Sequence, residues 1–258
     1  MAKQITANRL VYLAFAQQMQ SVLDAYRNGG QGAAMVQLYL MPSEPMKKAI
    51  NTIHRRHFPQ GAELSWRETM SQAGLKAGFG RFSRSWLQML RDWISENTLD
   101  TIVDQIDTYT RQWVGEQILL ITDQGLSIED LTRTLMGRFP RMRSIRIART
   151  ETIRARNAGH LASGNEMPFE SLKVWNSAQQ VRTRGSRRKD KADHLHMNGQ
   201  KKEVWESFID PRSKAQLDAP GNLSKTANNP GGAGDVVNCR CRVTFEPKRD
   251  ANGQLIMK

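Results

Sequence analysis

Apolar residues recur three and four positions apart along the first half of the chain, in one segment after another. The first set lies between residues 8 and 27, just before Gly29 and Gly30, and comprises Tyr12, Phe15, Met19, Val22 and Tyr26. Two later segments, 82–97 and 102–120, repeat the spacing. This period puts the apolar side chains on one face of a helix, and glycine often follows the last helical residue. We therefore predict a helical region over residues 1–139, with its first helix ending at the glycines.

Two further segments extend the helical pattern. Ser127, with Asp130 three residues later, fits a capping box at the start of a short helix, and the Phe-Pro pair at 139–140 is expected to end it. Another helix is predicted from about residue 141 to residue 163. One of its faces carries mostly small residues, namely Ile145, Ala148, Thr152, Ala155 and Gly159. Such a face lets another element of the protein approach closely.

The composition changes after Gly164. Short apolar pieces at 172–175 and 243–245 are typical of strands, and loops rich in Gly, Asn, Pro and Ser separate them. Long loops in a compact domain are often functional. We predict an α+β protein, in which the helical N-terminal half is followed by a small mixed α+β domain with long loops over residues 140–246. The polar end, 247–258, is predicted to be a flexible tail.

The formal net charge of +13 is concentrated in the second half of the chain. Residues 1–140 carry 15 Lys and Arg against 13 Asp and Glu, whereas residues 141–258 carry 23 against 12, so the two parts hold +2 and +11. Such a field attracts polyanions, and nucleic acid is the commonest large one, although acidic protein surfaces feel the same attraction. No apolar run reaches the roughly 20 residues that a membrane-spanning helix needs, so we expect no membrane partner.

A basic loop is predicted where six cationic residues stand within ten positions: Arg182, Arg184, Arg187, Arg188, Lys189 and Lys191. Guanidinium groups pair bidentately with phosphate, and a mobile arm can follow a nucleic-acid backbone without reading its sequence. No aromatic residue is interleaved for base stacking, so binding here would be directed to phosphate and sensitive to salt. The alternative is a solvated surface loop without a partner.

A candidate metal site involves the only two cysteines, Cys239 and Cys241, and the earlier His194. Thiolate and imidazole are ligands that zinc prefers, so these residues are a candidate structural zinc site. A strand would hold the two thiols too far apart, so joint ligation requires a turn at 239–241. The alternative is a pair of small buried thiols beside a hydrogen-bonded histidine. We do not expect a catalytic Cys-His pair, because the sequence nearby shows no acid with the spacing needed to orient the histidine. The remaining histidines with polar neighbours are expected at the surface or at helix ends: His54, His57 and His160.

Four segments occur in an order that resembles one protein family. They are IARTETIRARNAG at 147–159, VWNSAQQVRTR at 174–184, DHLHMNGQ at 193–200 and NCRCRV at 238–243. Together they resemble the phage Mu F-like minor head protein family, the phage head morphogenesis domain, over roughly residues 120–246. The resemblance implies two sets of site residues: scaffold residues of the domain at Arg149, Glu151, Asn157 and Trp175, and motif positions at His194, Cys239 and Cys241.

The same resemblance implies a minor virion protein of a tailed phage or prophage. It would lie inside the phage head, and in the host cytoplasm during assembly. Its expected partners are the portal protein, the major capsid protein or both, bound through the helical region, and packaged double-stranded DNA, contacted without sequence preference through the basic half. The family resemblance implies no catalytic residue.

Two other functions stay open. Asp193 and His194, followed by Asn222 and the cysteines, partly match an HNH nuclease, in which a histidine activates water and a metal polarises phosphate; the last metal position would fall on an asparagine such as Asn228. Domains of this family also occur joined to toxin or effector modules, although little chain follows Val243 to hold one.

The chain departs from many relatives at two places. Gln179 and Gln180 stand where an acidic residue is common, and residues 185–192 form an insertion after the arginines. A histidine also stands where some relatives have a second cysteine pair. Because this chain has only two cysteines, a metal ion cannot be bound by four thiolates.

Overall fold

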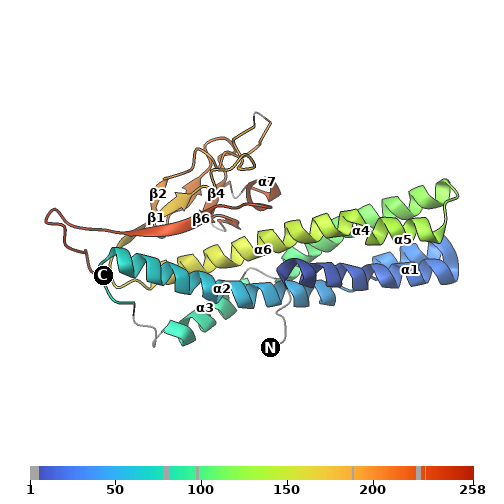
Figure 1. Cartoon of the computed structure of the whole chain (residues 1–258), viewed down its shortest axis with the longest axis horizontal. Helices are drawn as coiled ribbons and strands as arrows, with labels where there is room; N and C mark the ends of the chain where they lie inside the picture. Colours follow the sequence, from blue (N-terminus) through green and yellow to red (C-terminus); the bar gives the residue numbers. More distant parts are fainter. Residues whose placement is uncertain (1–5, 78–81, 97–98, 188, 225–227, 230) are drawn as a thin grey trace. The chain divides into compact units, whose positions relative to one another are not determined.

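The computed structural model describes residues 6–77, 82–96, 99–187, 189–224, 228–229 and 231–258, in two compact units (Figure 1). We call residues 1–52 with 94–148 the helical unit, and residues 53–93 with 149–258 the mixed unit. Helices make up the N-terminal half, and small antiparallel sheets occupy the C-terminal region. The prediction of an α+β protein is confirmed. No helix in the described ranges is long and apolar enough to cross a bilayer.

The helical unit is built around α1 (Ala7–Tyr39), α4 (Leu99–Asp123) and α5 (Ile128–Met136), with the first parts of α2 (Glu44–Gln72) and α6 (Arg138–Asn165). α1 packs against α4 and α5. One core contains Met19 and Val22 from the predicted face of α1, together with Leu23, Ala34, Leu38, Met41, Val114, Ile118, Ile121, Leu131 and Leu135. The predicted apolar face of residues 102–120 is only partly correct, because Tyr109 and Leu120 are exposed and Val114 and Ile118 are buried instead. Burial of these faces is the main source of stability in a bundle of this kind.

α1 is interrupted where the sequence places two glycines. Gly29 and Gly30 have non-helical backbone angles, and Gly30 has a φ of 67°, in the left-handed region that favours glycine. The helical hydrogen bonding then resumes and continues to Tyr39. The predicted break is therefore confirmed as a kink, but the prediction that the helix ends there was wrong, because Ala34 and Leu38 beyond the kink are buried in the core.

The start of α5 follows its predicted capping box. The Ser127 hydroxyl accepts a hydrogen bond from the backbone N–H of Asp130, and the Asp130 carboxylate accepts one from the backbone N–H of Ser127. The helix ends at Met136, before Gly137, and Pro140 lies instead in the first turn of α6. Proline is tolerated in a first turn because the N–H groups there have no acceptor within the helix.

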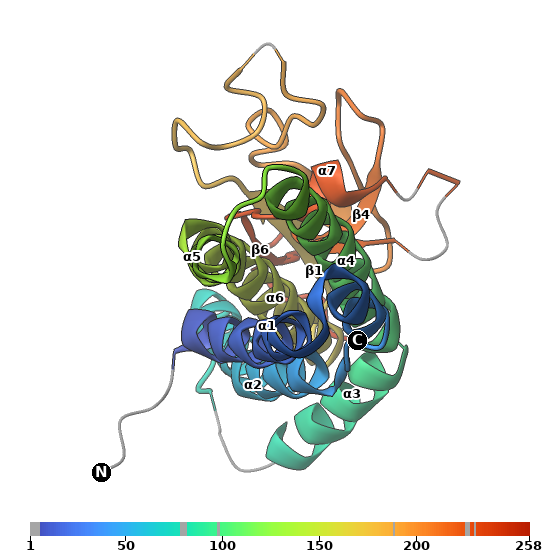
Figure 2. The same ribbon diagram turned by 90° about the vertical axis from the view of Figure 1, so that its right-hand side faces the viewer.

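Two small sheets form the strand region of the mixed unit. β1 (Ser171–Asn176) lies between β2 (Lys201–Glu203) and β6 (Arg242–Pro247), antiparallel to both. The second sheet has the order β3 (Phe208–Ile209), β4 (Gln216–Ala219) and β5 (Asn222–Leu223), and a short helix, α7 (Ala233–Val236), precedes β6. Figure 2 shows the long connection between β1 and β2 extending from the strands as an open loop.

The two strands predicted from the sequence, 172–175 and 243–245, are neighbours in one sheet. Trp175 of β1 is paired with Val243 of β6, and both are fully buried. They belong to a core that also contains both cysteines, together with Met197, Phe208, Ala215, Leu217, Ala219, Val236 and Phe245. The unit therefore gathers its apolar residues, its cysteines and its long loops around β1 and β6.

α2 and α6 run side by side within the mixed unit (Figure 1). A Cβ atom added to Gly61 would lie 2.2 Å from the carbonyl oxygen of Arg156, and one added to Gly159 would lie 2.1 Å from that of Phe58. Only glycine allows this approach of two backbones. α3 (Phe82–Glu96) follows, and its Trp93 ring lies 5.7 Å from that of Phe58.

The end of the chain is paired with the segment before β1. Phe169 forms an antiparallel bridge with Met257, and Arg249 forms one with Leu255. Leu255 also packs against a buried cluster that includes Trp66 and Phe169. We expected residues 248–258 to form a loose tail. They instead make backbone and apolar contacts with the segment before β1, and these contacts hold the end of the chain in place.

Replacing Gly159 with alanine should destabilise the protein. The added methyl group would lie 2.1 Å from one backbone atom of α2 and 2.8 Å from another, so the helices must separate. We expect a loss of about 1–3 kcal/mol in the free energy of unfolding, measured by urea denaturation. Gly32→Ala in α1 is the control, because its methyl group meets nothing within 4 Å and should be neutral or slightly stabilising. An unchanged unfolding midpoint for Gly159→Ala would contradict the close approach.

Candidate metal and phosphate site

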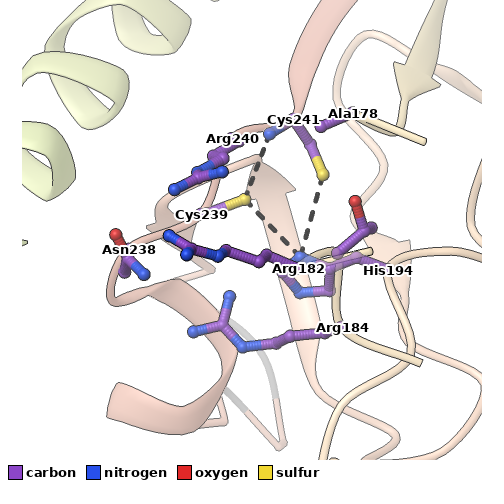
Figure 3. Close-up of a pocket in the computed structure, with 9 residues that line it drawn as sticks. Ala178, Arg182, Arg184, His194, Asn238, Cys239, Arg240 and Cys241 are labelled. Carbon is purple, nitrogen blue, oxygen red and sulfur yellow. Dashed lines mark hydrogen bonds between the residues drawn. The ribbon is translucent and has the colours of Figure 1, made fainter. Parts of the chain in front are cut away.

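Three residues from distant parts of the sequence meet in the mixed unit. His194 comes from the loop between β1 and β2, and Cys239 and Cys241 come from the turn between α7 and β6. The Nδ1 atom of His194 lies 3.5 Å from the Cys239 Sγ atom and 3.9 Å from the Cys241 Sγ atom (Figure 3). All three ligand atoms lie within 4.8 Å of one another, and all three side chains are buried. The structure thus brings together the three predicted metal ligands.

The turn that joint ligation requires is present. Asn238 has a φ of 61°, a left-handed conformation that asparagine tolerates, and β6 begins only at Arg242. Two residues of α6 hold this turn, because the Thr150 hydroxyl accepts a hydrogen bond from the Asn238 backbone N–H at 2.8 Å and Arg149 donates one to the Asn238 side-chain oxygen at 2.5 Å. The left-handed residue reverses the chain and turns both thiols towards His194.

The two thiols have different acidities. The hydrogen bond with Cys239, followed by the hydrogen bond and charge of His194, lowers the pKa of Cys241 to about 4, although burial opposes the shift. The same hydrogen bond raises the pKa of Cys239, and burial adds to this. The hydrogen-bonded pair therefore loses its first proton more readily than an isolated buried thiol would. A buried thiolate beside an imidazole is a good ligand for a soft or borderline metal ion.

Trp175 forms one wall of the cluster. Its ring lies edge to face with the His194 imidazole at 5.1 Å and with Phe208 at 5.3 Å. Within the described residues, the Nε2 atom of His194 is buried without a hydrogen-bond partner, so the two sulfur atoms are the polar neighbours of this imidazole. The aromatic wall excludes water from one side and leaves the ring's Nδ1 atom directed at the thiols.

Arginines surround the same pocket on its other side. Arg182, Arg184 and Arg240 line it together with the cysteines and His194 (Figure 3). Arg149 is close by, because it donates a hydrogen bond to Asn238, which lines the same pocket. Burial, followed by the charges of Arg240 and Arg182, lowers the pKa of Arg149. Arg187 lines an adjoining pocket that shares Arg182 and Asn238. The pocket is therefore strongly cationic.

The partners of these arginines are neutral. Arg149 donates to Asn238, Arg240 to the Gln180 side-chain oxygen, and Arg184 to the backbone carbonyl of Val237. Among the described residues, the four arginines in and beside the pocket form no ion pair with a carboxylate: Arg149, Arg182, Arg184 and Arg240. Like charges held together without counter-charges favour the binding of an anion.

The predicted basic loop is thus divided by the fold. Arg182, Arg184 and Arg187 line the two pockets, whereas Lys189 and Lys191 are exposed elsewhere on the loop, and Arg188 lies outside the described residues. Arg149 and Arg240 were not among the predicted phosphate contacts. Their only signal was position: Arg240 stands between the two cysteines, and Arg149 precedes the residue that holds their turn.

Asn157 of α6 joins the helix to the start of β6. Its side-chain nitrogen donates to the carbonyl oxygens of Pro220, at 2.9 Å, and Cys241, at 3.3 Å, and its side-chain oxygen accepts from the Val243 backbone N–H at 2.9 Å. All three hydrogen bonds are buried. They satisfy backbone groups that flank the cysteine turn and would otherwise cost free energy on burial.

Residues 117–244 match the family model described as Phage Mu protein F like protein. This part of the chain is a Mu F-like domain. The match begins within α4 and ends within β6, so it includes all the pocket residues described above, and it confirms the resemblance found over residues 120–246. Neither a curated protein nor a solved structure shows significant similarity to the chain. The family indicates a phage head morphogenesis protein and is generally structural rather than enzymatic.

The mixed unit also contains a buried charged group, which includes the predicted scaffold residue Glu151. His54 of α2 lies 2.9 Å from the carboxylate of Glu151, and Arg154 lies 3.3 Å from the same carboxylate. Both His54 and Glu151 are almost completely buried. Burial raises the pKa of Glu151, but Arg154 and His54 together lower it further, so the net shift is downward. Glu151 thereby connects α6 to α2.

Two histidines were expected at the surface and are not there. His54 is 2% exposed and His160 is 3% exposed, so that expectation was wrong for both. Burial, followed by the charges of Arg242 and Arg156, lowers the pKa of His160 to about 4. Their polar neighbours in sequence gave no signal of burial, because α2 and α6 cover them only in the tertiary structure.

The residues of the HNH nuclease alternative have other partners in the structure. The Asp193 carboxylate accepts hydrogen bonds from His196 and Arg212, and not from the adjacent His194. Asn222 donates its amide to the backbone carbonyl of Arg154 in α6. Asn228 is exposed. Among the residues that the structure describes, no acid therefore orients His194 as the base that catalysis of that kind requires.

Replacing Glu151 with alanine should strongly destabilise the mixed unit. The change leaves His54 buried without its partner, which typically costs about 3–5 kcal/mol. We expect a fall of this order in the free energy of unfolding. Glu63→Ala is the matched control in α2, because its ion pair with Arg67 is exposed and should contribute less than about 1 kcal/mol.

The same residue predicts an acid dependence of stability. Because the folded-state pKa of Glu151 is lowered, its contribution is complete above the unfolded-state pKa of about 4.3 and is lost as the pH falls through the folded-state value. Glu151→Gln should therefore flatten the acid side of a stability–pH curve measured by thermal unfolding. Equal acid sensitivity in the wild type and Glu151→Gln would exclude this role.

Proposed function

We propose that this protein is a minor head protein of a tailed phage or prophage that acts in head assembly and contacts packaged double-stranded DNA through the pocket arginines, Arg149, Arg182, Arg184 and Arg240. The observation that carries the DNA contact is that Arg182, Arg184 and Arg240 line one pocket of the Mu F-like domain and that Arg149 donates a hydrogen bond to Asn238, which lines the same pocket. The protein would then lie inside the virion head, after assembly in the host cytoplasm.

The charge of the domain supports a polyanionic partner. Residues 141–258 carry an excess of eleven positive charges, and the pocket arginines come from three segments, α6, the β1–β2 loop and the cysteine turn. A guanidinium group pairs bidentately with phosphate oxygens, so a cluster of such groups favours a phosphate-bearing partner. In a filled capsid, phosphate is the most abundant anion next to any internal protein.

The contact would be independent of sequence. In the described part of the chain no Phe, Tyr or Trp lines the two arginine pockets, and the His194 ring that does is buried, so base stacking has no exposed platform there. Binding through phosphates alone releases counterions and weakens steeply with salt. A protein that lies against a packaged genome needs this kind of contact, because the DNA sequence that passes it is arbitrary.

The helical unit is proposed to bind another head protein, the portal or the major capsid protein. Near the end of α1, Val36, Tyr39 and Leu40 are 61%, 82% and 63% exposed, and Met35 is partly exposed beside them. Neighbouring exposed apolar residues of this size favour a protein partner over solvent. The nearly neutral charge of residues 1–140 also favours a protein partner over DNA for this part.

Replacing Arg182 and Arg240 together with alanine should weaken binding to duplex DNA of mixed sequence. If both contact phosphate, the slope of log affinity against log salt concentration should fall in magnitude by about two, since each contact contributes about 0.9. Fluorescence anisotropy of labelled DNA over a salt series measures this slope.

The matched control is Arg27→Ala with Arg133→Ala, which removes the same charge from exposed ion pairs in the helical unit. An equal loss in both double variants would show a general charge effect and would reject the pocket as the contact. Incubation of the same DNA with the wild-type protein and a divalent metal ion tests the nuclease alternative. A nuclease would cleave the DNA, whereas a structural protein would leave the DNA intact.

Replacing Val36 and Leu40 with aspartate should abolish co-sedimentation with procapsids assembled from portal and major capsid proteins. The thermal unfolding midpoint should stay unchanged, because both side chains are exposed. Leu120→Asp is the control, because Leu120 is also an exposed leucine but lies on α4; this variant should sediment like the wild type. Retained sedimentation of the α1 variant would assign the partner to a different surface.

A further inference from the structure

We propose that the protein binds one zinc ion through the Nδ1 atom of His194 and the Sγ atoms of Cys239 and Cys241, with its fourth coordination position open to the arginine pocket. This metal site is independent of the proposed DNA contact, because it rests on the three ligand atoms and not on the arginines. Its role would be to hold the β1–β2 loop against the cysteine turn.

The spacing of the ligand atoms fits a tetrahedral zinc ion. With Zn–S and Zn–N bonds of about 2.3 and 2.05 Å, a sulfur and a nitrogen on one tetrahedral ion lie about 3.6 Å apart. The observed separations from the His194 Nδ1 atom are 3.5 and 3.9 Å, and no pair in the set exceeds 4.8 Å. The side chains therefore need little rearrangement to bind the metal.

The donor set selects the class of metal. Two thiols and one imidazole are soft and borderline ligands, which suit zinc and disfavour magnesium or calcium, since those ions take oxygen ligands. Zinc also binds thiolates strongly enough to remove the remaining proton from a buried cysteine. The sum of two thiolate charges and the zinc charge is zero, so the buried site becomes neutral on binding.

The surroundings of the ligands are those of a supported metal site. The backbone N–H of Cys241 lies 3.4 Å from the Cys239 Sγ atom and stabilises negative charge there. Trp175 fixes the plane of the His194 ring, and Arg149 and Thr150 hold the turn that carries both thiols. Groups that orient ligands in this way typically strengthen metal binding.

The position of the site explains what the metal would contribute. His194 lies in a connection of 24 residues between β1 and β2, and the sheets that flank it have strands of only two to six residues. Closing so long a loop on a turn 45 residues away costs conformational entropy that short strands offset poorly. A metal bridge would supply this link directly.

The fourth ligand would come from the pocket. In the described residues no further His, Cys, Asp or Glu joins the group, and the three ligands share their pocket with Arg182, Arg184 and Arg240. An open fourth position holds water or an exogenous anion. The cationic rim would favour an anionic ligand, such as a phosphate oxygen, over water.

Elemental analysis of the full-length protein, purified without chelators or metal-affinity resin from zinc-supplemented medium, tests the site. We expect close to one zinc per chain. Cobalt added to the metal-free protein should produce the intense visible bands of tetrahedral coordination together with thiolate-to-cobalt charge transfer. A wild-type protein with less than a tenth of an equivalent of zinc and no cobalt bands would overturn the proposal. This measurement is sufficient by itself and does not depend on the variants.

Variants then locate the metal. Cys239→Ser, Cys241→Ser and His194→Ala should each lower the zinc content at least tenfold at equal chelator concentration, whereas His196→Ala, an exposed histidine two residues from His194, should keep it. Zinc retained by all three ligand variants would place the ion elsewhere and reject this site. Zinc content is measured without DNA, so failure of the DNA contact leaves this result unaffected.

Discussion

The mixed unit depends on the way α6 holds the segment 238–243. Asn157 forms two buried hydrogen bonds to backbone groups of this segment, at Cys241 and Val243, and a third to Pro220. Arg149 and Thr150 bind its left-handed residue, Asn238. Buried backbone groups without partners are costly, so these contacts determine a single path for the chain. The strand β6, the two thiols and Arg240 all take their positions from that path.

Two kinds of chemistry then share one pocket. The thiols and His194 form its buried side against Trp175, and the arginines form its open side. The arginines also affect the thiols: the hydrogen bond with Cys241 and burial raise the pKa of Cys239, and the charge of Arg184 opposes this rise. The arginines and the thiolate form of the cysteines are compatible neighbours, because each lowers the electrostatic free energy of the other's charged form.

Parts of this description could be predicted from the sequence because their signals are local. The capping box of α5, the glycine break in α1 and the strand character of 172–175 depend on neighbouring residues and on the period of the apolar pattern. Burial of His54 and His160 could not be predicted, since it results from the close approach of α2 and α6 at Gly61 and Gly159. The pairing of 248–258 with the segment before β1 depends in the same way on distant partners.

The sequence by itself determined the residue types of the site and the charge of the half that holds it. His194, the cysteine pair and the basic loop could be named from composition and spacing, because zinc ligands and phosphate-binding groups are few. Only the tertiary structure decided which of them meet. It selected Arg182 and Arg184 from the loop and added Arg149 and Arg240, because hydrogen bonds between α6 and the cysteine turn bring segments about ninety residues apart into one pocket.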